Sequence, residues 1–273
     1  MRDMRNLAII TITSLLVACS TTTSPKSIDM NDINQLKNLE AEAPRNGETG
    51  MDSSQIRFKS LEDTGMSMGA QAGLAAAAKE IDDNLTKDKR HLEALFNFNG
   101  MMLSHGVLPP VLVQGDNNLN LADPDTIRVA DKTYKIVKQA RFATTPPNWR
   151  EYLWQSFTPP EMPHQVLLPT NADERRIWQH AITVGWEKGT QQAYSIFQQS
   201  LALLKRDYNG MILYRKLLQE NMITAPYVSK TELGITGNGD DMRVNDQVLR
   251  ISEHPQLQTD SNGWKAIVVK HDD

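Results

Sequence analysis

A serine between two glycines is the pattern in this chain that comes nearest to a catalytic motif. Gly65, Ser67 and Gly69 match Gly-x-Ser-x-Gly, in which a nucleophilic serine sits on a strained turn between a strand and a helix. Such an enzyme needs a downstream acid and histidine in a repeated β/α framework, and His254 is one available histidine. The β/α repeat is missing, however, and Gly73 continues a helical spacing. A serine hydrolase using Ser67 is therefore the alternative to a packed helix.

Small residues define one face of that expected helix. They recur every four positions and are Gly65, Gly69, Gly73 and Ala77. Small side chains at this spacing let a second backbone approach closely. The uncharged stretch of residues 64–78 is too short and too weakly apolar to span a bilayer. We therefore expect this face to pack tightly inside the protein.

Metal and cofactor sites are not indicated by residue spacing. None of the six histidines has a second histidine three or four residues away, which is the spacing typical of a zinc site on a helix. Asp123, Asp125 and Asp131 lack the glycine and the final glutamate of a calcium loop and are interpreted as turn formers. No phosphate loop or dinucleotide fingerprint is present. We expect no metal, no cofactor, no small-molecule substrate and no catalytic residue.

The first eighteen residues have the pattern of a secretory signal peptide. Arg2 and Arg5 precede a mostly apolar run over residues 7–18. A spanning helix needs about 20 apolar residues, so this run is too short to remain in the membrane and fits the apolar segment of a signal. We expect residues 1–18 to be removed on export.

The run ends at Cys19, which is the only cysteine of the chain. Together with this cysteine, three residues resemble the lipobox of bacterial lipoproteins: Leu16, Val17 and Ala18. The resemblance implies cleavage before Cys19 and its acylation with fatty chains such as palmitate. Several acyl chains anchor a protein stably. Ser20 stands where inner-membrane lipoproteins of Gram-negative bacteria carry Asp, which implies an outer-membrane, periplasm-facing location. The alternative is an ordinary signal peptide followed by a chance cysteine.

The charge balance argues against binding to nucleic acid. The chain carries 29 Lys and Arg against 33 Asp and Glu, a formal net charge of -4. Removal of residues 1–18 takes away two cations and one anion, which changes -4 to -5. No basic stripe is visible, so no electrostatic footprint for nucleic acid exists.

Element patterns indicate one folded domain. Helical spacing runs over residues 53–102 and 171–222, with glycines that weaken the second helix at Gly185, Gly189 and Gly210. Within the second helix an apolar seam steps by four, three, four and three residues, like that of a coiled coil, through Phe197, Leu201, Leu204, Tyr208 and Met211. Alternating patterns predict strands at residues 111–113, 126–129, 133–137 and 242–251, with a hairpin turn at Asp131 and Lys132. The elements come in blocks, which favours an α+β fold with long helices packed on a small antiparallel sheet.

The domain boundaries follow from composition. We expect a lipidated cysteine and flexible tether over residues 19–52, a core domain over 53–260 and a loosely ordered tail over 261–273. Within the core, an aromatic segment is the best candidate for binding a partner, and its members are Trp149, Tyr152, Trp154 and Phe157. Such residues are enriched in binding hot spots, but they also close protein cores, and the sequence favours neither.

Several longer motifs carry a resemblance to a known family. They occupy residues 104–112, 119–123, 126–131, 139–142, 149–154, 205–208 and 241–246, and the likeness covers roughly residues 55–260. The chain resembles the DotC family of type IVB secretion systems, which includes the TraI lipoproteins of I-type conjugative plasmids. This resemblance implies a non-catalytic lipoprotein of an outer-membrane core complex that assembles with a DotD-like lipoprotein and a DotH-like subunit. Only the lipobox ending at Cys19 carries over as a set of functional positions. The alternative functions are a serine hydrolase using Ser67 and a periplasmic ligand-binding lipoprotein, which would need a sizeable apolar pocket with convergent polar groups.

Overall fold

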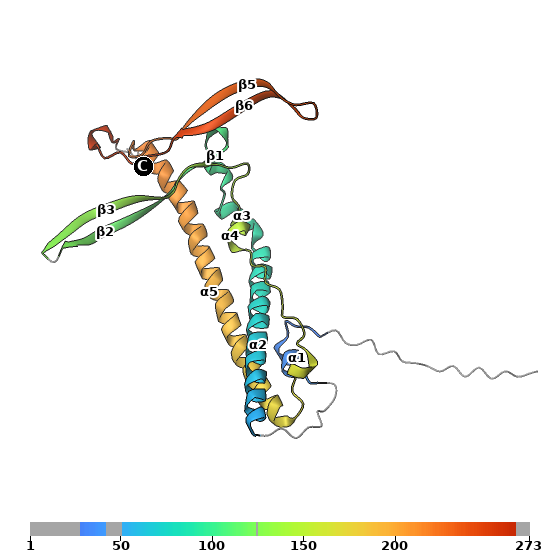
Figure 1. Cartoon of the computed structure of the whole chain (residues 1–273). Helices are drawn as coiled ribbons and strands as arrows, with labels where there is room; N and C mark the ends of the chain where they lie inside the picture. The colour runs from blue at the N-terminus through green and yellow to red at the C-terminus, as the bar shows by residue number, and fades with distance from the viewer. Residues whose placement is uncertain (1–27, 42–50, 124, 266–273) are drawn as a thin grey trace, which may run out of the picture.

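Two long helices form a stalk that carries two β-hairpins at one end (Figure 1). The computed structural model describes residues 28–41, 51–123 and 125–265. Helices α2 (Met51–Lys87) and α5 (Ala172–Gln219) run side by side in the same direction, and we call this pair the stalk. At 1.5 Å per residue, the 48 residues of α5 extend over about 72 Å. Residues 88–171 return the chain to the start of α5.

The returning segment and the C-terminal region contribute the short elements. The helices are α3 (Lys89–Leu95) and α4 (Trp149–Leu153), and α1 (Ile33–Lys37) precedes the stalk. In the described residues the strands form three antiparallel pairs, with β1 (Val107–Leu108) on β4 (Arg141–Phe142), β2 (Val111–Asp123) on β3 (Thr126–Lys138), and β5 (Tyr227–Gly237) on β6 (Met242–Glu253). The predicted α+β class, with long helices and antiparallel pairing, is confirmed. The expected single sheet is divided into three pairs.

Glycines from both helices bring the two stalk backbones into contact. A Cβ atom on Gly69 or Gly73 would lie 2.4 Å from the carbonyl oxygen of Ile182 or Trp186 on α5. From the other side, a Cβ on Gly185 or Gly189 would lie within 2.2 Å of a carbonyl oxygen of α2. Only glycine fits at these positions, because any larger side chain collides with backbone. The structure places Gly65 and Ala77 on the same buried face of α2.

Helix α5 is continuous, although its glycines led us to expect a weaker rod. Asn171 caps the helix by accepting from the Glu174 amide at 2.9 Å, which satisfies an amide that has no partner within the helix. The glycines do not break the helix, since each lies against another backbone segment and is held there by packing. The apolar seam expected along α5 faces a buried cluster near the head of the stalk, which we call the upper core. Leu204 and Met211 are buried there, beside the partly buried Phe197, Leu201 and Tyr208.

Residues 28–41 form a strap across the lower stalk, within the stretch of residues 19–52 for which we predicted a tether. Leu36 and Leu39 are buried in a cluster with Leu61 and Trp178. The indole Nε1 of Trp178 donates to the carbonyl oxygen of Leu36 at 2.9 Å. Burial of the two leucine side chains stabilises the docked segment. The polar composition of the segment as a whole did not indicate this. Residues 19–27 and 42–50 lie outside the described residues.

We expect Trp178→Phe to loosen the strap selectively. Phenylalanine keeps most of the apolar contact but cannot donate to Leu36, and losing such a hydrogen bond costs about 1 kcal/mol. Amide hydrogen exchange over residues 33–39 should therefore speed up by about fivefold, while the upper part of α5 keeps its protection. Trp264→Phe is the matched control, because its indole Nε1 donates to Gln258 at the opposite end of the molecule. Unchanged exchange over the strap in Trp178→Phe would contradict the docking.

Two other predicted boundaries are wrong, and one strand was not predicted. The chain does not turn at Asp131 and Lys132, since both lie inside β3 and the hairpin turns between Asp123 and Thr126. The helix expected over residues 53–102 begins at Met51 and is interrupted after Lys87, before the short α3. The strand partner of β6 was not predicted and is β5.

The expected tail also begins later than residue 261. The Lys265 amide donates to the carbonyl oxygen of Glu220 at 2.8 Å, and the Trp264 indole donates to that of Gln258 at 3.1 Å. These bonds hold residues 261–265 against the end of α5. Residues 266–273 lie outside the described residues.

Candidate functional site: two projecting arms

The hairpin of β2 and β3, which we call the first arm, projects from the head of the stalk with one apolar face. Leu119 pairs across the strands with Val129, and Asn120 pairs with Arg128. Residues opposite one another share a face, and successive residues alternate between faces. Leu119, Val129 and Ile127 therefore lie on one side and are 73%, 69% and 60% exposed. We call these three residues the first patch.

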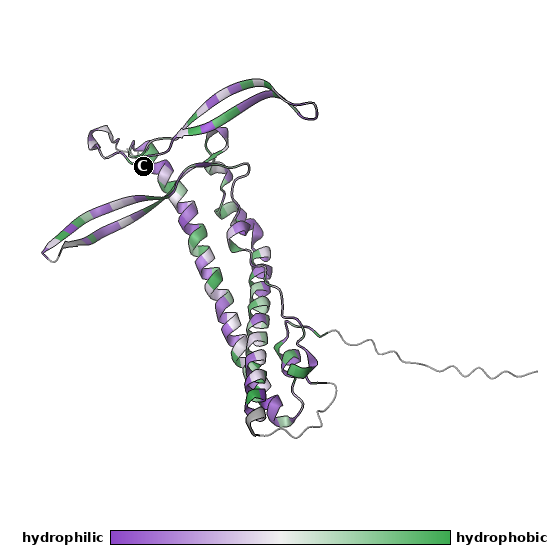
Figure 2. Ribbon diagram, viewed as in Figure 1, coloured by the Kyte–Doolittle hydropathy of each residue, from purple (hydrophilic) through white to green (hydrophobic). Residues whose placement is uncertain are grey.

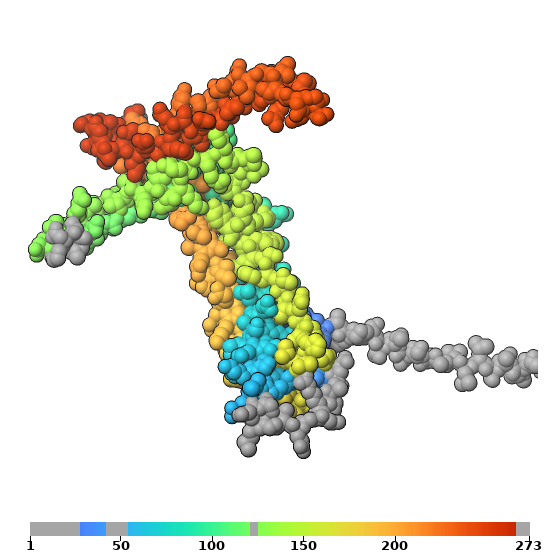
Figure 3. Space-filling model, in the orientation of Figure 1, coloured from blue at the N-terminus to red at the C-terminus, as the bar shows by residue number. Residues whose placement is uncertain are grey.

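The hairpin of β5 and β6, the second arm, has the same organisation. Ile235 pairs with Val244, Thr236 with Arg243 and Gly237 with Met242. Ile235, Met242 and Val244 consequently share a face and are 70%, 67% and 60% exposed. We call them the second patch. Figure 2 shows apolar segments along both arms, and Figure 3 shows both arms standing clear of the stalk.

The base of the first arm is fixed to α5 by a close backbone contact. A Cβ atom on Gly210 would lie 2.5 Å from the carbonyl oxygen of Leu112 at the start of β2. Leu112 is buried there with Tyr214 and Leu217 of α5, and burial raises the pKa of the Tyr214 phenol to about 12. Strand β2 therefore crosses α5 at Gly210, where there is no room for a larger side chain on the helix.

A buried carboxylate adds an ionic attachment at the same base. Asp207 of α5 is 1% exposed and accepts from Lys138 at the end of β3, from Arg206 at 2.8 Å and from the Tyr152 hydroxyl at 3.0 Å. Burial acts to raise the pKa of this carboxyl, but the hydrogen bonds from Lys138, Arg206 and Tyr152 outweigh burial and hold the pKa below its ordinary value. Asp207 thus links β3, α4 and α5.

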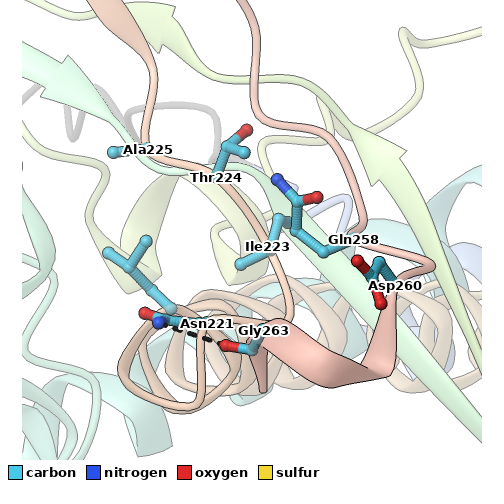
Figure 4. A pocket seen from close by; sticks show the side chains of 8 residues that line it. Asn221, Ile223, Thr224, Ala225, Gln258, Asp260 and Gly263 are labelled. Atoms are coloured by element: carbon cyan, nitrogen blue, oxygen red, sulfur yellow. Dashed lines mark hydrogen bonds between the residues drawn. The ribbon is translucent and has the colours of Figure 1, made fainter. Parts of the chain in front are cut away.

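The base of the second arm is held by backbone hydrogen bonds after the end of α5. Ile223 and Leu257 form an isolated antiparallel bridge, and the Gln258 amide donates to the Met222 carbonyl oxygen at 2.8 Å. A pocket of about 460 Å³ lies beside this joint (Figure 4). The Asn221 side-chain amide donates to the Gly263 carbonyl oxygen at 3.4 Å within it. The pocket is part of the joint that orients the arm.

The members of the aromatic segment, residues 149–157, differ in whether they are buried in the core or exposed to a partner. Trp149 is 1% exposed and belongs to the upper core, and the Tyr152 ring stacks on Phe98 with a centroid separation of 6.2 Å. Phe157 is half-buried, whereas Trp154 is 49% exposed. Only Trp154 is thus well placed to meet a partner, and its binding role stays a prediction.

The other predicted positions are located as follows. Ser67 is exposed in the middle of α2, so the strand-to-helix turn that a nucleophilic serine needs is not formed there. Leu16, Val17, Ala18 and Cys19 lie outside the described residues. Within the described ranges no cluster of three metal-ligating side chains occurs. No helix among the described residues has the length and apolarity required to cross a bilayer.

Comparison with known protein families shows which family the chain belongs to. The family model for TraI, described as type IV secretory system, conjugal DNA-protein transfer, matches residues 55–266. The chain belongs to this family. The match confirms the predicted membership in a secretion and conjugation family. No curated protein matches the chain.

Three of the stretches that carry the sequence resemblance lie at the head of the stalk and in its arms. Residues 126–131 lie in β3, residues 205–208 surround the buried Asp207, and residues 241–246 enter β6. Sequence reasoning singled out these stretches for their resemblance to a family without assigning them a position in the fold. It missed Asp207 and Gly210 as attachment points, and the only available signal was a lone acid and a lone glycine within an apolar helix pattern.

Proposed function

We propose that this TraI-family chain is a non-catalytic, lipid-anchored structural component of the type IV secretion and conjugation apparatus. In this proposal Cys19 holds the chain at the outer membrane, and the folded part faces the periplasm. The stalk carries the two arms, which take part in assembling the neighbouring subunits. A DotD-like lipoprotein and a DotH-like subunit are the partners that we propose.

The observation that carries the proposal is that both arms expose apolar side chains to solvent. Each is a two-stranded hairpin with apolar side chains facing solvent, and an isolated two-stranded hairpin is marginally stable in water. A contiguous apolar surface on an otherwise polar protein marks an interaction site. At the same time the first arm is attached at its base through Gly210 and Asp207, and the second through the bridge of Ile223 and Leu257. Arms that are fixed at their bases and expose apolar faces suit a protein that assembles other subunits.

The proposed anchor is tested by Cys19→Ser. This variant should lose all labelling by a palmitate analogue and should leave the outer-membrane fraction, because the acylated sulfur is gone. The folded part should keep its helical circular dichroism. Ser20→Ala, which leaves the cysteine in place, is the control and should label and fractionate as the original chain does. Normal outer-membrane fractionation of Cys19→Ser would overturn the anchor.

A further inference from the structure

The strap of residues 28–41 is fixed to the end of the stalk that lies away from the arms (Figure 1). Leu36 is fully buried and accepts from the indole of Trp178. At the end of the strap, the Ala41 amide donates to the carbonyl oxygen of Pro169 at 3.1 Å. The strap is therefore held by apolar burial and by hydrogen bonds at two separate points.

The attachment of the strap is confined to the lower part of α5. Among the described residues, its apolar cluster reaches up this helix as far as Trp186. At 1.5 Å per residue, Trp186 lies about 21 Å from the start of the helix at Ala172 and about 50 Å from its end at Gln219. Both arms are attached near that far end, the first beside Gly210 and the second after the helix has ended.

The chain between Cys19 and the strap, which we call the leash, is short. The strap begins at Ile28, nine positions after Cys19. Nine residues span at most about 32 Å, even when the chain is fully extended. This reach exceeds the distance of about 21 Å to the lower end of α5 and falls short of the distance of about 50 Å to its upper end.

We infer that the docked strap limits the reach of the acylated Cys19, so that the lower stalk faces the lipid surface and both arms point away from it. This inference rests on the proposed function, because it needs a lipid anchor at Cys19. An inverted chain, with its head on the bilayer, would require a leash of about 50 Å. The exposed apolar side chains of the arms are thereby kept away from lipid and face the periplasm.

The strap is what makes this limit effective. If residues 28–41 were not docked, the chain from Cys19 to Met51 would contain 32 residues. Such a chain reaches about 115 Å when fully extended, which is longer than α5 itself. Every orientation of the stalk would then be within reach of the anchor.

Energy transfer to labelled lipid tests the orientation with the full acylated chain in vesicles of phosphatidylethanolamine and phosphatidylglycerol that contain an acceptor dye on a lipid. Lys59→Cys and Lys216→Cys each provide one thiol for a donor dye, because Cys19 is the only native cysteine and is acylated. Both lysines are exposed. Lys59 lines a groove with Arg176 of α5, so the two labels lie about 60 Å apart along the stalk. The donor at Lys59→Cys should lose most of its emission, whereas the donor at Lys216→Cys should keep most of it.

Further variants separate the effect of the strap from that of the leash. An insertion of about sixteen Gly and Ser residues into the leash leaves the strap docked but lengthens the reach, so the difference between the two labels should shrink. Leu36→Asp with Leu39→Asp frees the strap and should abolish the difference, while circular dichroism checks that the stalk stays helical. Asn34→Asp with Asn38→Asp is the matched control, because it adds the same two charges at exposed positions of the strap. It should behave as the original chain does.

Equal losses of emission at the two positions of the original chain would overturn the inference, as would a greater loss at Lys216→Cys. A difference that survives both the longer leash and the freed strap would overturn it as well. In these cases the bound chain leaves the proposed anchor standing. A chain that does not bind the vesicles at all would overturn the anchor and the inference together.

Discussion

Replacement of Gly189 by alanine should lower the free energy of unfolding by about 3 kcal/mol, because the added methyl group meets backbone. The new Cβ atom would lie 2.0 Å from the Ala70 carbonyl oxygen and 2.8 Å from the Leu74 amide nitrogen. Backbone atoms of a helix cannot rotate away as the end of a side chain can. The gain in helix propensity from glycine to alanine is about 1 kcal/mol, which is too small to offset this collision.

Urea unfolding followed by circular dichroism at 222 nm measures the effect. Gly100→Ala is the matched control, because a Cβ atom there has no neighbour within 4 Å, and its effect should stay below about 1 kcal/mol. If Gly189→Ala proves as stable as the original chain, then the two stalk helices are further apart than described here.

Replacement of Asp207 by asparagine should destabilise the head of the stalk by about 2 kcal/mol at neutral pH, the range for hydrogen bonds to a charged group. The amide keeps the shape of the carboxylate but loses the charge that attracts Lys138 and Arg206. It also leaves one polar atom without a suitable partner at a buried position. The loss should appear as faster amide exchange at the base of the first arm, in residues 134–138.

The pH dependence of this effect has a definite sign. The pKa of Asp207 is lowered in the folded chain, so the folded state binds the proton less readily than the unfolded state does. The stabilisation is therefore complete above the ordinary carboxyl pKa and is lost as the pH falls through the lowered folded value. The difference in stability between the original chain and Asp207→Asn should shrink between neutral pH and about pH 3. Asp131→Asn, at an exposed site of the same arm, is the control and should cost little stability at neutral pH. A difference that grows on acidification would contradict the cluster.

The helical part of the fold could be predicted well, because its signals are periodic and long. The seam of Phe197, Leu201, Leu204, Tyr208 and Met211 repeats every three to four residues. Helix α5 covers almost the whole predicted range. The four-residue spacing of Gly65, Gly69 and Gly73 predicted a close backbone contact. The partner helix was not predicted, because the matching glycines of α5 resembled interruptions rather than a second half of one interface.

The arms were harder to predict, since neither face of these hairpins is buried. A strand that is exposed on both sides tolerates Asp131 and Lys132 in its middle, so polar residues there did not mark a turn. Strand β5 contains Gly234 with a positive φ at a register shift, and this irregularity interrupts the alternation that reveals a strand. The apolar patches looked like ordinary core positions, because burial depends on what else packs nearby.

The attachment points depend on contacts between distant parts of the chain. Lys138 and Asp207 are 69 residues apart, and no local pattern connects them. The short strap around Leu36 was likewise concealed, because two buried leucines within a polar segment carry too weak a periodic signal. The family could therefore be recognised from the sequence, whereas the geometry of the candidate site could be described only from the structure.

Affinity purification of the full chain from detergent-solubilised membranes, in cells that hold the whole transfer system, tests the account most directly. The account predicts that the acylated chain brings other secretion subunits with it, identified by mass spectrometry, and that Cys19→Ser brings markedly less. A chain that purifies alone, with the Cys19 thiol free or residues 1–18 still attached, would contradict it.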